Sequence, residues 1–72
     1  MANLTHRQYD QLERAIVDGS RIAIYRRGTE YVLIPLRIGL RDGRETIEAR
    51  NPVTGDTMTL VLDEIDSLEF VR

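Results

Sequence analysis

The stretch YVLIPLRIGLR, residues 31–41, decides the fold because apolar side chains alternate along its whole length. The even-numbered positions are all aliphatic: Val32, Ile34, Leu36, Ile38 and Leu40. Such alternation is typical of a half-buried strand, so the even-numbered side chains from 32 to 38 are predicted to fill a core. Pro35 and Gly39 interrupt the other face, and both residue types are tolerated where a strand bulges or bends. We therefore expect a long strand that curves sharply enough to serve both halves of a small barrel.

A turn signal follows this strand directly. Asp42-Gly43 is typical of a two-residue type I′ hairpin. The predicted register pairs Arg41 with Arg44, Leu40 with Glu45, Ile38 with Ile47, Arg37 with Glu48, and Leu36 with Ala49. Apolar pairs then share one face and the ion pair lies on the other, which supports this register. The tip of the hairpin, with Leu40 beside Glu45, is expected to lie in water.

The turn before the strand can be closed in two ways. A two-residue Gly28-Thr29 loop would pair Ile24 with Leu33, whereas a three-residue loop over 27–29 would pair Ile24 with Val32. A one-residue slip turns a strand inside out, and burial of Val32 favours the three-residue loop. Leu33 is then expected to face outward, under the N-terminal helix.

The remaining elements have local signals of their own. Thr5 and Gln8 form a capping box before a helix predicted at about 6–18, and Gly19 is placed to end it. Short strands are expected at 21–26, 30–40, 57–62 and 67–71, with a 3₁₀ turn over 63–66. Their inward side chains are Met58, Leu60, Leu62, Leu68 and Phe70. The chain is thus predicted to be mainly β (α+β), one domain over 1–72, with a helix followed by a five-stranded SH3/Sm-like barrel at about 21–71.

Composition limits the possible functions. The 72 residues contain no cysteine, which excludes disulfides and thiol chemistry, and no apolar run is long enough to span a membrane. Because no secretion signal opens the sequence, we expect a cytoplasmic protein. All ten basic residues are arginine, and the net charge is −2. Residues 21–50 hold seven arginines against four acidic residues, a net of +3, whereas residues 51–72 hold one arginine against five acidic residues, a net of −4.

Residues 12–71 resemble the WYL domain of bacterial transcriptional regulators. The matching positions are Ala15-Ile16, Ile22 to Tyr25, Pro35-Leu36 and Leu62-Asp63-x-Ile65. The Trp-Tyr-Leu triplet of that family aligns with Glu45-Thr46-Ile47, so both aromatic residues are replaced. The resemblance implies a regulatory barrel that holds a nucleic acid or nucleotide through arginines and aromatic residues.

The chain also resembles the Rof-type inhibitors of the Rho terminator. That likeness is carried by Tyr9-Asp10-x-Leu12-Glu13-x-Ala15 and by Leu62-Asp63-x-Ile65-x-Ser67-Leu68. It implies a small barrel that binds a protein partner. Both families have an Sm/SH3-like fold, and a fold by itself does not assign a function.

No residue pattern indicates catalysis. The only histidine, His6, is expected in the first helical turn, and neither serine has a general base that the sequence places nearby. Asp63, Glu64 and Asp66 lack the spacing of a calcium loop. We therefore expect no enzyme activity, no metal and no cofactor.

Two binding hypotheses remain. In the first, an RNA or nucleotide binds at the arginine-rich hairpins, and the candidate residues are Arg26, Arg27, Arg37, Arg41 and Arg44, with Tyr25 or Tyr31 as a stacking surface. Arg41 opposite Arg44 is the main hint, because like charges opposed across a hairpin cost stability. In the second, the chain is a protein-interaction or self-assembling module that uses an edge strand and an acidic surface of Asp63, Glu64, Asp66 and Glu69. A core this small makes a homo-oligomer a plausible way to gain stability.

Overall fold

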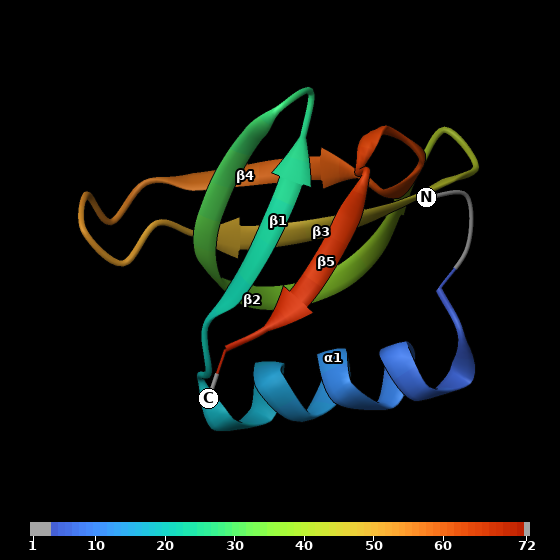
Figure 1. The fold of residues 1–72 in the computed structure, drawn as a ribbon. Coiled ribbons are helices and arrows are strands. Elements are labelled where there is room, and N and C mark those ends of the chain that lie inside the picture. The colour runs from blue at the N-terminus through green and yellow to red at the C-terminus, as the bar shows by residue number, and fades with distance from the viewer. Residues whose placement is uncertain (1–3, 72) are drawn as a thin grey trace.

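The computed structural model describes residues 4–71, in which one helix is followed by five strands (Figure 1). In chain order the elements are α1 (His6–Asp18), β1 (Ile22–Arg26), β2 (Thr29–Arg41), β3 (Arg44–Arg50), β4 (Thr57–Val61), the 3₁₀ turn η1 (Leu62–Glu64) and β5 (Ser67–Phe70). The predicted order of elements is confirmed. Where bounds were predicted, each helix and strand end lies within one residue of its expected position.

Local signals fix both ends of α1. The Thr5 side chain accepts a hydrogen bond from the backbone of Gln8, and the Gln8 side chain accepts one from the backbone of Thr5. Gly19 ends the helix in the left-handed conformation, at φ 70°, which glycine adopts without a steric penalty. The capping box and the helix end are therefore as predicted, and Leu12 and Ala15 are buried on the face toward the sheet.

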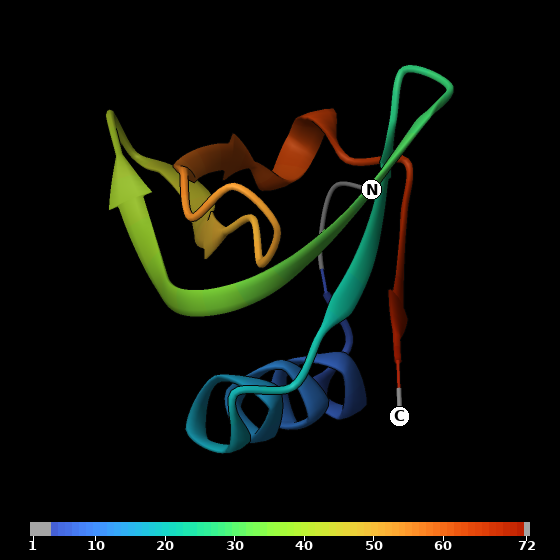
Figure 2. The same ribbon diagram turned by 90° about the vertical axis from the view of Figure 1, so that its left-hand side faces the viewer.

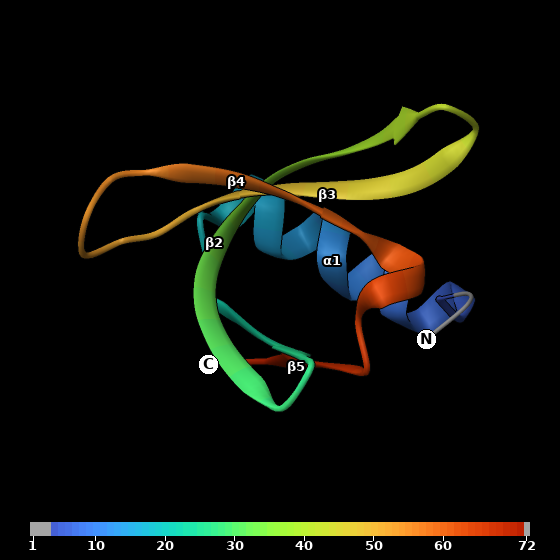
Figure 3. The same ribbon diagram turned by 90° about the horizontal axis from the view of Figure 1, so that it is seen from above.

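All five strands form one antiparallel sheet in the order β4-β3-β2-β1-β5. β2 is long enough to pair with β1 through its first half and with β3 through its second half. Figure 2 shows β2 curving from one layer to the other, and Figure 3 shows β1 and β5 on one side with β3 and β4 on the other. β4 and β5 are the two edges of the sheet, and α1 lies across one end of the folded sheet (Figure 1).

The first hairpin departs from the prediction. Its loop is only two residues long, Arg27-Gly28, with φ values of 52° and 77°. Ile24 consequently pairs with Tyr31, and Ile22 pairs with Leu33. The expected three-residue loop is wrong, and so is the outward position of Leu33, which is 1% exposed.

A bulge then reverses the alternation of β2. The register shifts between Pro35 and Arg37, so Pro35 rather than Leu36 lies opposite Ala49. Beyond the bulge the predicted pairs are confirmed, including Ile38 with Ile47. The expectation that even positions 32–38 fill the core is therefore largely wrong, because Val32 and Leu36 are 40% and 36% exposed, and Ile34 and Ile38 are half-buried.

The same bulge explains the proline. Pro35 is buried and lies at the point where the ladder is disrupted, which is where a residue without an N–H is tolerated. An extra residue in one strand also increases the local bend and twist. The sharp curve of β2 was predicted, and the bulge beside Pro35 is the feature that produces it.

The core lies between the two halves of the bent sheet and under α1. Its largest fully buried side chains are Leu12, Ile22, Ile24, Leu33, Pro35, Ile47, Leu60 and Ile65. Of the inward positions predicted after residue 57, Leu60, Leu62 and Leu68 are buried, and Met58 and Phe70 pack half-buried against the core. Burial of this side of the sheet leaves the outer face of β2, β3 and β4 available for function.

Candidate anion-binding groove

A groove of about 250 Å³ lies on the outer face of β2, β3 and β4. It is lined by Arg37, Ile38, Gly39, Leu40, Arg41, Thr46, Glu48 and Thr59. The register explains this grouping, because Arg37 lies opposite Glu48, Glu48 lies opposite Thr59, and Gly39 lies opposite Thr46. The missing side chain of Gly39 hollows the centre, since a Cβ there would lie 3.3 Å from the Thr46 hydroxyl oxygen. We refer to this surface as the arginine groove.

One cation of the groove is held in place by an acidic neighbour. The Nε and Nη2 atoms of Arg37 lie 3.0 Å and 2.9 Å from the same carboxylate oxygen of Glu48. The Arg37 side chain is 73% exposed, so this ion pair adds little stability. Its effect is to fix the direction of the guanidinium and to cancel most of its charge.

Arg41 is different, because among residues 4–71 it forms no ion pair. It lies at the hairpin end of the groove, directly before the Asp42-Gly43 turn. The hydroxyls of Thr46 and Thr59 belong to the same groove. Thr46 is only 5% exposed, and Thr59 lies across Glu48 from Arg37, so Arg41 is the group that a phosphate or carboxylate oxygen would bind first.

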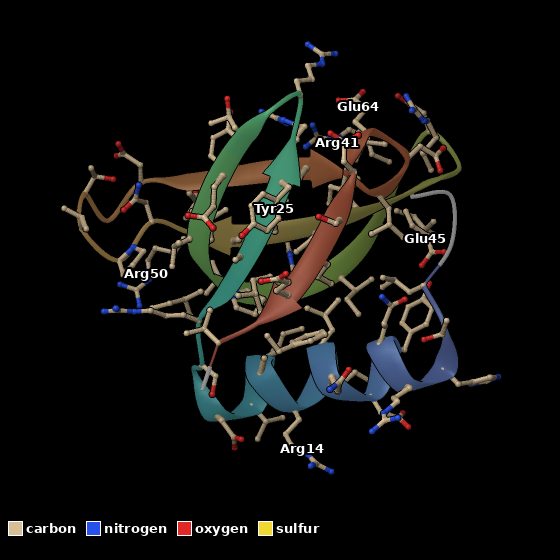
Figure 4. The ribbon with its side chains drawn as sticks, viewed as in Figure 1. Arg14, Tyr25, Arg41, Glu45, Arg50 and Glu64 are labelled. Atoms are coloured by element: carbon tan, nitrogen blue, oxygen red, sulfur yellow. The ribbon has the colours of Figure 1, made fainter. Side chains whose placement is uncertain are left out.

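Arg44, which lies opposite Arg41, is neutralised from another part of the chain. Its Nε atom is 3.7 Å from Asp63 Oδ2, and its Nη2 atom is 4.0 Å from Glu64 Oε2. The acidic side chains of η1 thus offset the repulsion between the two opposed arginines. Figure 4 shows Arg41 and Glu64 at the same end of the molecule.

The β2–β3 hairpin is tied to the helix near its tip. The Tyr9 hydroxyl of α1 donates a hydrogen bond to the Glu45 carboxylate at the start of β3. This hydrogen bond, together with burial and the Glu45 charge, raises the pKa of Tyr9. The contact fixes the position of the groove relative to the core, and Figure 4 shows Glu45 on the side that faces the beginning of α1.

The other predicted residues lie on the β1–β2 hairpin. Arg26 stacks over the Tyr31 ring at 5.2 Å from its centroid, and the ring also packs against the core. The backbone N–H of Arg27 donates to Asp66 Oδ2 at 3.0 Å. Tyr31 is therefore already covered by a side chain of this protein and offers less surface for stacking a base.

Tyr25 lies in an acidic environment. Its hydroxyl donates a 2.5 Å hydrogen bond to Glu30, and this bond, with burial and the charges of Glu30 and Glu69, raises the pKa of Tyr25 to about 12. Two carboxylates near the ring would repel a phosphate. The structure thus separates the predicted ligand residues into two hairpins, and it places Tyr25 with acids rather than with the arginines of the groove.

Three of the four acids predicted to bind a protein partner face the hairpins instead. Asp63 and Glu64 contact Arg44, and Asp66 accepts from Arg27. Glu69 lies on β5, near Tyr25. The sequence reasoning treated the arginines and the acids as separate surfaces, whereas η1 brings Asp63 and Glu64 to Arg44.

A second hollow of about 200 Å³ lies between the end of α1 and β5. It is lined by Gln11, Arg14, Ala15, Asp18, Ser20, Arg21, Phe70 and Val71. Figure 4 shows the Arg14 side chain directed away from the sheet. The arginine groove is the better candidate, because it contains Arg37 and Arg41, which the sequence predicted to bind a ligand.

Within residues 4–71, no group of three or more histidine, cysteine, aspartate or glutamate side chains is arranged to hold a metal ion. Over the same residues, α1 is too short and too polar to cross a membrane. His6 is exposed in the first turn of α1.

Thr46 and Thr59 were not among the residues predicted to bind a ligand. The predicted β2–β3 register could have identified Thr46, which lies opposite Gly39, whereas Thr59 depends on the pairing of β3 with β4, for which no register was predicted. No protein-family model matches the chain, and no curated protein is significantly similar to it in sequence.

Proposed function

We propose that this chain is a non-enzymatic regulatory module with an Sm/SH3-like barrel architecture, which binds the phosphate backbone of a nucleic acid at the arginine groove. The order β4-β3-β2-β1-β5 and the single bent strand shared by both layers support the barrel. The resemblance to WYL and Rof-type barrels supports a regulatory role in the cytoplasm. The observation that carries the proposal is the uncompensated Arg41 within a hollow that also contains Arg37 and two threonine hydroxyls.

The composition of the groove favours phosphate over bases. No aromatic side chain is among its lining residues, and Tyr25 and Tyr31 both belong to the other hairpin. Bases bound by single-strand-binding proteins usually stack on aromatic rings, whereas arginines bind the backbone. Binding should therefore depend weakly on base sequence. A net charge of −2 further implies modest affinity, and the decrease with salt should correspond to only one or two phosphate contacts.

The test is fluorescence anisotropy with a labelled RNA of about a dozen nucleotides, titrated at about 20 mM and about 150 mM salt. Wild type should bind at low salt and weaken at higher salt. Arg41→Ala should lower the affinity at least about threefold and reduce the salt slope by about 0.7, the value for one lost phosphate contact on a single strand. Arg41→Glu combined with Arg44→Glu should abolish binding.

Arg7→Ala is the matched control, because Arg7 is an exposed arginine in the first turn of α1, outside the groove. It should leave the affinity within about twofold of wild type, since it removes the same charge elsewhere. Phosphate contacts are strongest at low salt, so absence of binding there would overturn the proposed function.

A second candidate function is protein interaction or self-assembly. It is favoured by the two sheet edges, because β4 pairs only with β3 and β5 pairs only with β1. An edge strand presents unpaired backbone groups to which another strand can add. If this candidate is correct, sedimentation should show concentration-dependent oligomers or a pull-down should capture a protein whose binding is lost in Glu69→Arg. A monomer that captures nothing would exclude it.

A further inference from the structure

The acidic side chains of η1 form ion pairs with Arg44, a side chain to which an incoming phosphate could also bind. Asp63 and Glu64 both approach Arg44, at 3.7 Å and 4.0 Å between the nearest charged atoms. Arg44 in turn lies directly opposite Arg41, the free guanidinium of the groove. Two carboxylates on one arginine leave a net negative charge beside the place where the ligand would bind.

We infer that Asp63 and Glu64 are specificity-determining residues, which compete internally for Arg44 and so select a chain of phosphates over a single phosphate. The inference rests on the proposed function, because it concerns which ligand the arginine groove accepts. A mononucleotide can engage Arg41 only. A phosphodiester chain can place one phosphate at Arg41 and a neighbouring phosphate at Arg44, where it displaces the carboxylates.

The contacts are weak enough to be displaced. The side chains of Arg44, Asp63 and Glu64 are 49%, 54% and 37% exposed, and each ion pair lies near the upper limit of salt-bridge distance. Exposed pairs of this kind are strongly screened and contribute little stability. A ligand with two adjacent negative charges can therefore take over Arg44.

The backbone of this turn, in contrast, is held firmly. The Asp66 N–H donates to the Tyr25 carbonyl at 2.8 Å, and Asp66 Oδ2 accepts from the Arg27 N–H at 3.0 Å. Leu62 and Ile65 on either side of the acids are buried. The acids can therefore leave Arg44 only by rotation of their side chains, and they remain close to the groove as competitors.

The test compares wild type with Asp63→Asn/Glu64→Gln and uses two probes, a labelled oligouridylate of the same length as the RNA above and uridine monophosphate. The double variant should bind the oligouridylate at least about threefold more tightly, with a salt slope close to that of wild type, because a phosphate contacts Arg44 in both proteins. The double variant should also bind the monophosphate more tightly than wild type does. The ratio of oligouridylate affinity to monophosphate affinity should therefore be smaller than in wild type. Asp63→Asn alone is a milder variant, and circular dichroism verifies that each variant is folded.

Arg44→Ala, made in two backgrounds, measures how strongly Asp63 and Glu64 compete with a phosphate for Arg44. In wild type, where a phosphate reaches Arg44 only by displacing the acids, this substitution should lower oligouridylate affinity by about two- to threefold and leave the affinity for uridine monophosphate unchanged. In the Asp63→Asn/Glu64→Gln background it should cost more than about fivefold, because Arg44 is then free to bind a phosphate. Asp10→Asn/Glu13→Gln removes the same charge from exposed positions of α1 and is the matched control.

Equal effects of Arg44→Ala in the two backgrounds would overturn the inference while the proposed function stands. An equal gain from Asp10→Asn/Glu13→Gln would also overturn it, since net charge alone would then explain the result. If no variant binds either probe at low salt, both the proposed function and the inference are wrong.

Discussion

Hydrogen bonds between tyrosines and glutamates join distant parts of this small chain. Tyr9 binds Glu45 between α1 and β3, and Tyr25 binds Glu30 across the first hairpin. In both pairs the carboxylate favours the protonated phenol, which raises the pKa of the tyrosine. These pairs therefore stay intact through the neutral range and are lost in alkaline solution when the phenols ionise.

The pH dependence of Tyr25 follows from this bond. Its pKa is about 12 in the folded protein, against about 10 in an unfolded chain, so the folded state holds the proton more tightly. The resulting stabilisation is complete below pH about 10 and is lost as the pH rises from about 10 toward 12. Glu30→Gln removes the charge, so the late component of an ultraviolet phenol titration should move back toward pH 10. An unchanged titration would show that Glu30 is not the cause.

At the residue scale, the sequence predicts only what is local. The Thr5–Gln8 capping box, the left-handed Gly19 and the Asp42-Gly43 turn are correct because each depends on residues within one turn of chain. The partners of Arg44 could not be predicted, because Asp63 and Glu64 reach it only after β3, β4 and η1 have packed. Opposed arginines in a hairpin indicate that a counter-charge is needed but do not identify its source.

At the scale of elements, the second half of β2 was predicted correctly and the first half was not. The strand, its bend and its pairing with β3 beyond the bulge were foreseen. In its first half the wrong face was predicted to be buried. The even-numbered residues are aliphatic on both sides of the bulge, so the sequence does not show that the buried positions change from odd to even there. Aliphatic side chains occupy both faces before Pro35, so alternation alone could not decide which face is buried.

Two leucines of β2 test this register with the same chemical change. Leu33 is 1% exposed, and Leu36 at the bulge is 36% exposed. Leu33→Ala should lower the free energy of unfolding by about 2–4 kcal/mol, because it leaves a cavity in the core. Leu36→Ala should cost less than about 1 kcal/mol. Urea denaturation measures both, and a larger loss for Leu36→Ala would show that the even-numbered face is the buried one.

Over the whole molecule, charge is divided between the two layers of the bent sheet. The layer of β3 and β4 carries the arginine groove, whereas Glu30 and Glu69 surround Tyr25 on the β1–β5 side. The charge count by segment did not predict this division, because Glu30 belongs to the basic segment 21–50 and β4 to the acidic segment 51–72. Folding separates Arg26 and Arg27 from Arg37 and Arg41, because the two hairpins belong to different halves of β2.

The most direct test of the arginine groove is a map of backbone amide chemical shifts during titration with the short RNA at about 20 mM salt. We expect the largest changes at Gly39, Arg41, Thr46 and Thr59, which line the groove. Amides of Tyr25, Glu30 and Glu69, on the acidic side, should remain unchanged. Shifts centred on the acidic side, or none at any RNA concentration, would contradict the account.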